Sequence, residues 1–137
     1  MTYDQWLASV PENFKKDRLW EFTAYRRALF LYDLAWEDCA TLMKDLRGRG
    51  NADQLNRSLG SICANIEEGY GRGFGKEYDY FLRVALGSAR EGRGWYYRSR
   101  RLLSPAILQH RYALLDEIIA LLVSKLHGQK KEAAEVK

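Results

Sequence analysis

The sequence predicts an all-α protein, an antiparallel up-down four-helix bundle, and three observations support this class. The 137-residue chain has only two prolines, Pro11 and Pro105, so long stretches keep the backbone amides that helices need. Apolar residues recur at alternating intervals of three and four along successive segments, which is the spacing of a helix face. Glycine-rich stretches or a Ser-Pro pair separate these segments. The length fits one domain with a modest core.

The N-terminal segment is expected to form a short arm outside the bundle. Thr2 and Gln5 have the spacing of a capping box, which predicts a short helix that ends before Pro11. Three roles stay open for this arm: it packs on the bundle, docks on a neighbouring subunit or holds a partner. The expected division is an N-terminal arm, a four-helix bundle and a flexible tail, at residues 1–18, 19–128 and 129–137.

The first bundle helix is expected from about Leu19 to Leu46. Its large apolar residues form a heptad series that would face a partner helix. The series consists of Phe22, Tyr25, Leu29, Tyr32, Trp36, Cys39, Met43 and Leu46.

The second helix is expected to start after the break at residues 47–50, with Asn51 and Gln54 as its cap, and to stop near Gly69. Glycines then alternate with aromatic and basic residues up to Lys76. No strand precedes this link and no acidic residue stands at dinucleotide-motif spacing, so a dinucleotide cradle is not supported. Two interpretations remain open. The link is a plain interhelix loop, or its side chains also contact nucleic acid through Tyr70, Arg72, Phe74 and Lys76.

The third helix is expected from about Lys76 to Leu103, with two unlike sides. One side is narrow, and small residues in its middle permit close approach of a neighbouring helix. This side consists of Tyr78, Leu82, Ala85, Ala89, Gly92, Tyr96, Ser99 and Leu103.

The other side of the third helix is basic. From Arg83 to Arg101 there are six arginines and one acidic residue, Glu91. An ordinary solvated helix face is one interpretation, although such faces usually mix charges of both signs. The other is a phosphate-contacting surface, since guanidinium groups suit bidentate contact and base stacking. The candidate nucleic-acid-binding residues are Arg83, Arg90, Arg93, Arg98, Arg100 and Arg101, with Arg72 and Lys76 from the link.

The fourth helix is expected to start at Ser104-Pro105, an N-cap followed by proline at the first helical position, and to end at Gly128. Its apolar arc is wider than one bundle core requires. We therefore expect a second partner, and infer homo-oligomerisation, with burial under the N-terminal arm as the rival explanation. The expected oligomer interface consists of Ile107, Leu114, Ile118 and Leu121.

Catalytic chemistry is not indicated. The two histidines, His110 and His127, have no metal-ligand spacing, and no nucleophile motif is present. Cys39 and Cys63 are expected to be reduced thiols among apolar neighbours. We expect no enzyme activity, no metal, no cofactor and no membrane partner, and a cytoplasmic location, because neither a spanning segment nor a signal peptide is recognisable. The formal net charge of +4 suits an acidic partner.

Two consecutive segments carry a family resemblance. Residues 61–72 and 77–88 resemble the signature S-I-x-x-N-I-x-E-G-x-G-R followed by E-x-x-x-F-L-x-x-A-x-G-S. This signature belongs to the four-helix-bundle proteins encoded by intervening sequences of 23S ribosomal RNA genes, which include accessory proteins of diversity-generating retroelements. Cys63 stands where the family commonly has proline, and the arginines after Glu91 are this chain's own feature. The signature residues singled out here are Asn65, Glu68, Gly69, Glu77 and Ser88.

The resemblance implies assembly into a ring-like homo-oligomer, typically a pentamer. It also implies binding of RNA or DNA and of a reverse transcriptase, as in the retroelement relatives. The polar signature residues are interpreted as structural, with Arg72 paired to Glu68 or Glu77. The leading hypothesis is thus a non-enzymatic oligomeric nucleic-acid-binding scaffold, and the alternative is a protein–protein interaction module without a nucleic-acid ligand.

Overall fold

The computed structural model describes residues 1–73 and 75–136, and from residue 129 onward the backbone alone. Phe74, one of the expected nucleic-acid contacts, lies outside the described residues. All regular structure in the described part is helical, as predicted. The elements in order are α1 (Tyr3–Ser9), α2 (Glu12–Lys15), the 3-10 helix η1 (Arg18–Glu21), α3 (Thr23–Met43), α4 (Leu46–Gly71), α5 (Gly75–Arg98) and α6 (Pro105–Val136).

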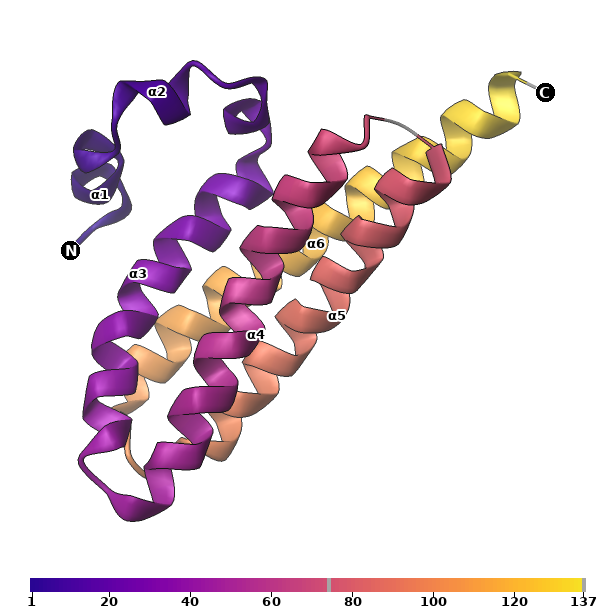
Figure 1. The fold of residues 1–137 in the computed structure, drawn as a ribbon. Coiled ribbons are helices and arrows are strands. Elements are labelled where there is room, and N and C mark those ends of the chain that lie inside the picture. Colours follow the sequence, from indigo (N-terminus) through magenta and orange to yellow (C-terminus); the bar gives the residue numbers. More distant parts are fainter. Residues whose placement is uncertain (74, 137) are drawn as a thin grey trace.

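The four long helices α3 to α6 form a bundle with alternating directions (Figure 1). Each helix packs against its neighbours in sequence, and α6 closes the bundle against α3. The α3–α4 turn and the α5–α6 loop therefore lie at one end, the lower end in Figure 1, and the α4–α5 link lies at the other. The predicted four-helix bundle is confirmed.

The narrow side of α5 is buried as predicted, and α4 is the helix that approaches it. Ala85 and Ala89 are fully buried. A Cβ added at Gly92 would lie 2.7 Å from Leu59 Cδ2, and one at Gly69 would lie 3.2 Å from Phe81 Cβ. These distances are shorter than ordinary van der Waals contact, so the α4–α5 interface depends on residues without a side chain.

The buried stripe of α3 differs from the predicted heptad series. Trp36 is 67% exposed and Leu46 is 78% exposed, and Met43 also lies on the surface. Alanines take the inward positions because their small side chains let the neighbouring helices approach closely. The prediction relied on the large apolar residues of α3. The predicted stripe therefore differs from the observed buried stripe by about one residue position. The buried residues of α3 are Ala24, Tyr25, Ala28, Phe30, Leu31, Ala35, Asp38 and Leu42.

The predicted start of α4, after residue 50 with Asn51 and Gln54 as its cap, is also wrong. The helix begins at Leu46, where the Asp45 carboxylate accepts a hydrogen bond of 2.8 Å from the Arg47 amide. Gly48 lies inside the helix and is buried, because a Cβ there would clash with Leu42 O and lie 2.8 Å from Leu102 Cδ1. The glycine serves close packing rather than a turn.

The N-cap of α6 is confirmed, because Ser104 Oγ accepts a hydrogen bond of 3.2 Å from the Ile107 amide. The predicted end at Gly128 is wrong, since the helix continues to Val136. One glycine costs a helix only about 1 kcal/mol, which neighbouring turns can offset.

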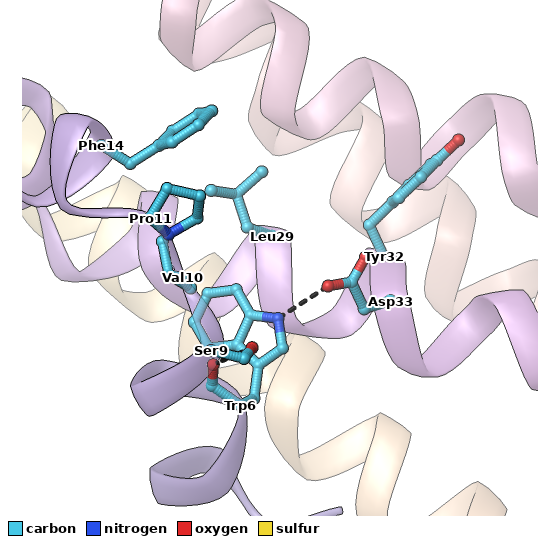
Figure 2. A pocket seen from close by; sticks show the side chains of 8 residues that line it. All are labelled: Trp6, Ser9, Val10, Pro11, Phe14, Leu29, Tyr32 and Asp33. Carbon is cyan, nitrogen blue, oxygen red and sulfur yellow. Dashed lines mark hydrogen bonds between the residues drawn. The ribbon is translucent and has the colours of Figure 1, made fainter.

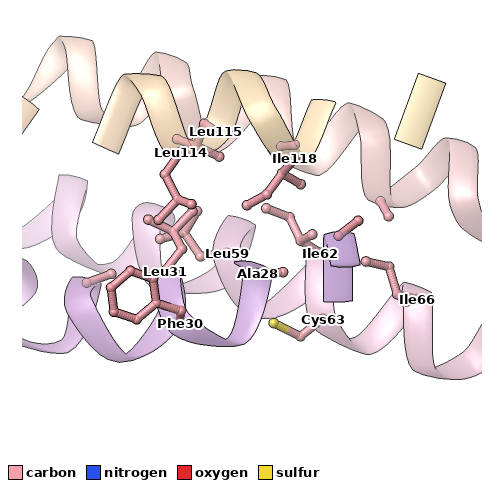
Figure 3. Packing of buried hydrophobic residues seen from close by; sticks show 14 of the residues in the cluster. Ala28, Phe30, Leu31, Leu59, Ile62, Cys63, Ile66, Leu114, Leu115 and Ile118 are labelled. Carbon is pink, nitrogen blue, oxygen red and sulfur yellow. The ribbon is translucent and has the colours of Figure 1, made fainter. Parts of the chain in front are cut away.

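The wide apolar arc of α6 is largely used inside one chain. Leu114 and Ile118 are buried in the core, where α6 contacts both α3 and α5. Figure 3 shows Leu115 and Ile118 on the side of α6 that faces Leu59 and Ile62 of α4. The assignment of Leu114 and Ile118 to an oligomer interface is therefore wrong, whereas Ile107 and Leu121 are half-buried.

The N-terminal arm packs on its own bundle. The predicted capping box of Thr2 and Gln5 is present. Trp6 is 3% exposed among the rings of Tyr3, Trp20 and Phe30, and its Nε1 donates a hydrogen bond of 2.7 Å to Asp33 Oδ2 on α3. Of the three roles left open for the arm, this structure shows the first.

A buried polar group, which the sequence analysis missed, joins three helices. Asp38 of α3 is 3% exposed, and Arg111 of α6 is 9% exposed. The Tyr96 hydroxyl of α5 donates to Asp38 Oδ2 at 2.6 Å, and Arg111 Nε donates to the same oxygen at 2.7 Å. Arg111 Nη2 donates to Asp38 Oδ1 at 3.2 Å, so both carboxylate oxygens are satisfied.

The two cysteines are free thiols. Burial raises the pKa of Cys63 to about 12 and that of Cys39 to about 11. Both groups therefore stay protonated and unreactive at neutral pH. Across the described residues, no helix combines the length and apolarity needed to cross a bilayer.

Candidate nucleic-acid interface

The outward side of α5 carries exposed guanidinium groups. Arg83, Arg90 and Arg101 are exposed, and none of them forms a salt bridge with a residue in the described part of the chain. At about 100° per residue Arg83 and Arg90 lie opposite the buried stripe of α5, whereas Arg101 lies in the turn beyond the helix, which ends at Arg98. The two unlike sides expected from the sequence are therefore present in the fold.

Two of the predicted contacts are already paired with carboxylates. Arg93 Nη1 lies 2.7 Å from Asp116 Oδ1 of α6, and Arg72 Nη2 lies 3.0 Å from Glu68 Oε1. The second pair confirms the expectation that Arg72 meets Glu68 or Glu77. Both pairs are exposed to solvent, where such bridges contribute only about 0–1 kcal/mol. An incoming phosphate can therefore compete for either arginine.

Two further arginines lie over aromatic rings. Arg98 Cζ is 4.5 Å from the centre of the Trp95 ring, and Arg100 Cζ is 4.2 Å from that of Tyr97. Arg100 Nη1 also donates a hydrogen bond of 3.1 Å to the Tyr97 carbonyl. These contacts hold the guanidinium planes in place, which lowers the entropy cost of binding a ligand through them.

The predicted set does not form one cluster. Arg72 and Lys76 lie at the α4–α5 end of the bundle, whereas Arg98, Arg100 and Arg101 lie at the opposite end (Figure 1). Because α5 has 24 residues, these groups are roughly 36 Å apart along the helix axis. A ligand that contacts them all must be extended.

The structure adds basic residues that the sequence analysis did not include. The α3–α4 turn lies next to the end of α5, because Asn51 Nδ2 donates to Ser99 Oγ at 3.2 Å. The turn thereby brings its own cations to those of the α5–α6 corner. We call this cluster the basic pole, and it consists of Lys44, Arg47, Arg49, Arg98, Arg100 and Arg101.

One carboxylate sits within the basic pole. Arg47 Nη2 lies 2.8 Å from Asp45 Oδ2, and hydrogen bonds from Arg47 lower the pKa of Asp45 to about 2. Asp45 also caps α4, so its charge has a structural role. The sequence signal for the pole is the Arg-Gly-Arg-Gly run at residues 47–50. Its glycines suggested a break between helices, and its arginines were not included among the predicted contacts.

Two glycines on the outward side of α5 have no packing role inside the chain. A Cβ at Gly87 would meet nothing within 4 Å, and the nearest atoms to one at Gly94 would be those of the Arg98 guanidinium, at 3.8 Å. Glycine inside a helix nevertheless costs about 0.5–1 kcal/mol relative to alanine. Their absence of side chains leaves the helix backbone accessible between the arginines, as close approach by an external partner requires.

Among the polar signature residues, Ser88 bonds across the α4–α5 hairpin and Asn65 supports this contact from within α4. Ser61 Oγ and Ser88 Oγ are 2.8 Å apart, and Asn65 Nδ2 donates to Ser61 Oγ at 2.9 Å. The same Asn65 group donates to the Ser61 carbonyl at 2.8 Å. The Ser61–Ser88 bond crosses from α4 to α5, and the two Asn65 bonds lie within α4 and hold Ser61 in place, which supports the structural interpretation. Glu77, by contrast, is exposed in the first turn of α5.

Fold and surface together define the class of protein: an all-α four-helix bundle with one basic helix side and a basic pole. A profile of the family described as "23S rRNA-intervening sequence protein" matches residues 21–124. The chain therefore belongs to this family. The match starts at the 3-10 helix before α3, so most of the arm lies outside it.

A solved structure confirms the fold. The crystal structure of a protein of unknown function, from the S23 ribosomal protein family of Bacteroides thetaiotaomicron VPI-5482, superposes with a TM-score of 0.71. It is 22% identical and covers 76% of this chain and 98% of its own. No curated protein sequence matches the chain significantly. At 22% identity this similarity supports the fold but no particular function.

Proposed function

We propose that this protein is a non-enzymatic scaffold that binds RNA or DNA through the outward side of α5 and the basic pole. The observation that carries the proposal is the set of Arg83 and Arg90 on the outward side of α5 and Arg101 in the turn after it, all exposed without a carboxylate partner in the described residues. Arginines that are buried in a fold are normally paired, whereas these three are exposed. Charges that the fold does not use are available to an anionic ligand.

The contacts are expected to be mainly to phosphates. The basic residues extend along the whole length of α5, which suits a polyanion rather than a single small anion. Gly87 and Gly94 allow the sugar-phosphate backbone to approach the helix closely. Binding of this kind is tolerant of sequence and depends strongly on salt. Exposed Tyr97 offers a ring on which an unpaired base can stack.

A binding titration against salt tests the proposal. We expect single-stranded RNA and DNA oligonucleotides to bind at low salt, with a logarithmic slope of about −0.7 per phosphate contact. Reversing Arg83, Arg90 and Arg101 to glutamate should weaken binding at least about 10-fold and flatten this slope. The matched control is Lys15→Glu, Lys16→Glu and Arg18→Glu, which changes the net charge equally but lies in the arm. Salt-independent binding, or unchanged affinity after the α5 reversal, would contradict the proposal.

A second candidate, a protein-interaction module, rests on a different observation. Trp36 and Met43, seven residues apart, form an exposed apolar stripe along α3, and Leu46 at the start of α4 is also exposed. Such a stripe fits homo-oligomerisation, and the family resemblance extends this to a ring such as a pentamer. A reverse transcriptase is the further partner that the resemblance suggests, in the cytoplasm. Recovery of a stable protein complex after nuclease treatment, from a variant that no longer binds nucleic acid, would favour this candidate.

A further inference from the structure

A pocket of about 230 Å³ opens between the N-terminal arm and α3 (Figure 2). Trp6 anchors the arm at one side of the pocket and is buried. Phe14 of α2 lines the other side and remains largely exposed, although it is apolar. The arm thus docks through α1 and leaves a space beside α2 that no side chain of the described residues fills.

Most of the lining is apolar. Val10, Pro11 and Leu29 contribute aliphatic surface, and the rings of Phe14 and Tyr32 complete the walls. A dry cavity of about 150 Å³ can hold benzene, whereas drug-sized ligands occupy roughly 300–1,000 Å³. The pocket therefore has room for one ring or a short alkyl chain.

The polar groups of the pocket favour a positive charge. Ser9 Oγ donates its proton to the Trp6 carbonyl at 2.6 Å, so this hydroxyl has no proton left for a ligand. Asp33 Oδ2 accepts the Trp6 indole proton at 2.7 Å, while Asp33 Oδ1 has no hydrogen-bond partner among the described residues. No basic residue lines the pocket. Its polar side therefore offers a negative charge and a hydrogen-bond acceptor.

We propose that this pocket binds a small organic cation, an ammonium group attached to a single aromatic ring or a short alkyl chain. The apolar body would lie against Leu29 and Phe14, and the ammonium group would reach the Asp33 carboxylate. Figure 2 shows that carboxylate held beside Trp6, at the side of the pocket away from Phe14. Aromatic walls add favourable interaction with a cation. The site uses neither α5 nor the basic pole, so it is independent of the nucleic-acid proposal.

NMR titration with two matched probes tests the site. Phenethylammonium carries the proposed charge at pH 7, and 2-phenylethanol is its neutral analogue. The Trp6 indole N–H resonance, assigned with Trp6→Phe, reports binding because this group is hydrogen-bonded to Asp33. We expect the ammonium probe to bind about 3- to 10-fold more tightly than the alcohol, the range for a partly exposed ion pair assisted by aromatic rings.

Three variants separate the contribution of the Asp33 charge from that of the apolar space. Asp33→Asn keeps an oxygen acceptor for Trp6 but removes the charge, so the preference for the ammonium probe should disappear. Glu37→Gln removes an equal charge one turn further along α3, outside the pocket, and should keep the preference. Leu29→Phe fills the pocket and should weaken both probes. Three results would overturn the proposal: no shift of the Trp6 resonance at millimolar probe, equal binding of both probes, or an unchanged preference in Asp33→Asn.

Discussion

At the scale of single residues, the buried group of Asp38, Tyr96 and Arg111 has the largest energetic consequences. Burial and the Asp38 carboxylate raise the pKa of Tyr96, so its hydroxyl remains a donor at neutral pH. Burial alone would lower the pKa of Arg111, but hydrogen bonds and the charge of Asp38 outweigh it and raise that pKa. Arg111 therefore stays protonated, and its burial depends on the Asp38 carboxylate.

Removing only one charge of this group should be costly. In Arg111→Met the Asp38 carboxylate would stay buried without its counterion, and we expect a loss of about 3–5 kcal/mol in the free energy of unfolding. Replacing the whole group, with Asp38→Leu, Tyr96→Phe and Arg111→Met together, should restore most of this stability, since no polar group is then left unpaired. Urea unfolding measures both variants. A single substitution that costs less than the triple one would argue against mutual dependence.

At the scale of helices, the glycines of α5 fall into two groups with opposite roles. Gly92 faces Leu59 of α4 and allows two backbones to approach, so it stabilises the bundle. Gly87 and Gly94 face outward, where a side chain would fit without a clash. These outward glycines weaken the helix without a compensating contact inside the chain. We attribute the presence of Gly87 and Gly94 to contact with an external partner.

Alanine substitutions distinguish the two groups. Gly92→Ala should destabilise the protein by about 1–3 kcal/mol, because its Cβ would overlap a fully buried leucine. Gly87→Ala should instead stabilise it by about 0.5–1 kcal/mol. Combined with Gly94→Ala, it should also reduce affinity for an RNA oligonucleotide. Urea unfolding and binding titrations of the same samples check this, and unchanged affinity would remove the glycines from the interface.

At the scale of the whole molecule, one chain buries its core but leaves part of its apolar surface exposed. The outer side of α3 presents Trp36 and Met43 to solvent, and Leu29 on the same helix lines the pocket under the arm. The arc of α6, from which assembly was first inferred, is instead largely buried. Any self-association should therefore depend on α3 rather than on Leu114 or Ile118.

Light scattering of variants tests which helix carries self-association. We expect the wild-type chain to have a mass several times its 15.9 kDa, and Trp36→Glu with Met43→Glu to lower the mass towards the monomer. The control is Val123→Glu, which places the same charge at an exposed apolar position of α6 and should leave the mass unchanged. Circular dichroism verifies that the helices persist. A monomeric wild type would contradict the assembly proposal outright.

The sequence predicted the helices and the two sides of α5 because periodicity and small residues report directly on packing. It missed part of the stripe of α3, where Ala28 and Ala35 face inward while Trp36 and Met43 are exposed. It also missed the Asp38 group and the basic pole, because both depend on residues that are distant in sequence. Asp38 and Arg111 lie on different helices, and only the completed bundle brings Arg47 and Arg49 to the end of α5.

The basic pole draws its cations from two separate hairpins, α3–α4 and α5–α6. A polyanion bound there would contact both hairpins at once and stabilise their packing against each other. During synthesis, this surface cannot form until the ribosome has added Arg101, the last residue of the basic pole. Occupancy of the pole would thus report that the end of α5 has reached the α3–α4 turn.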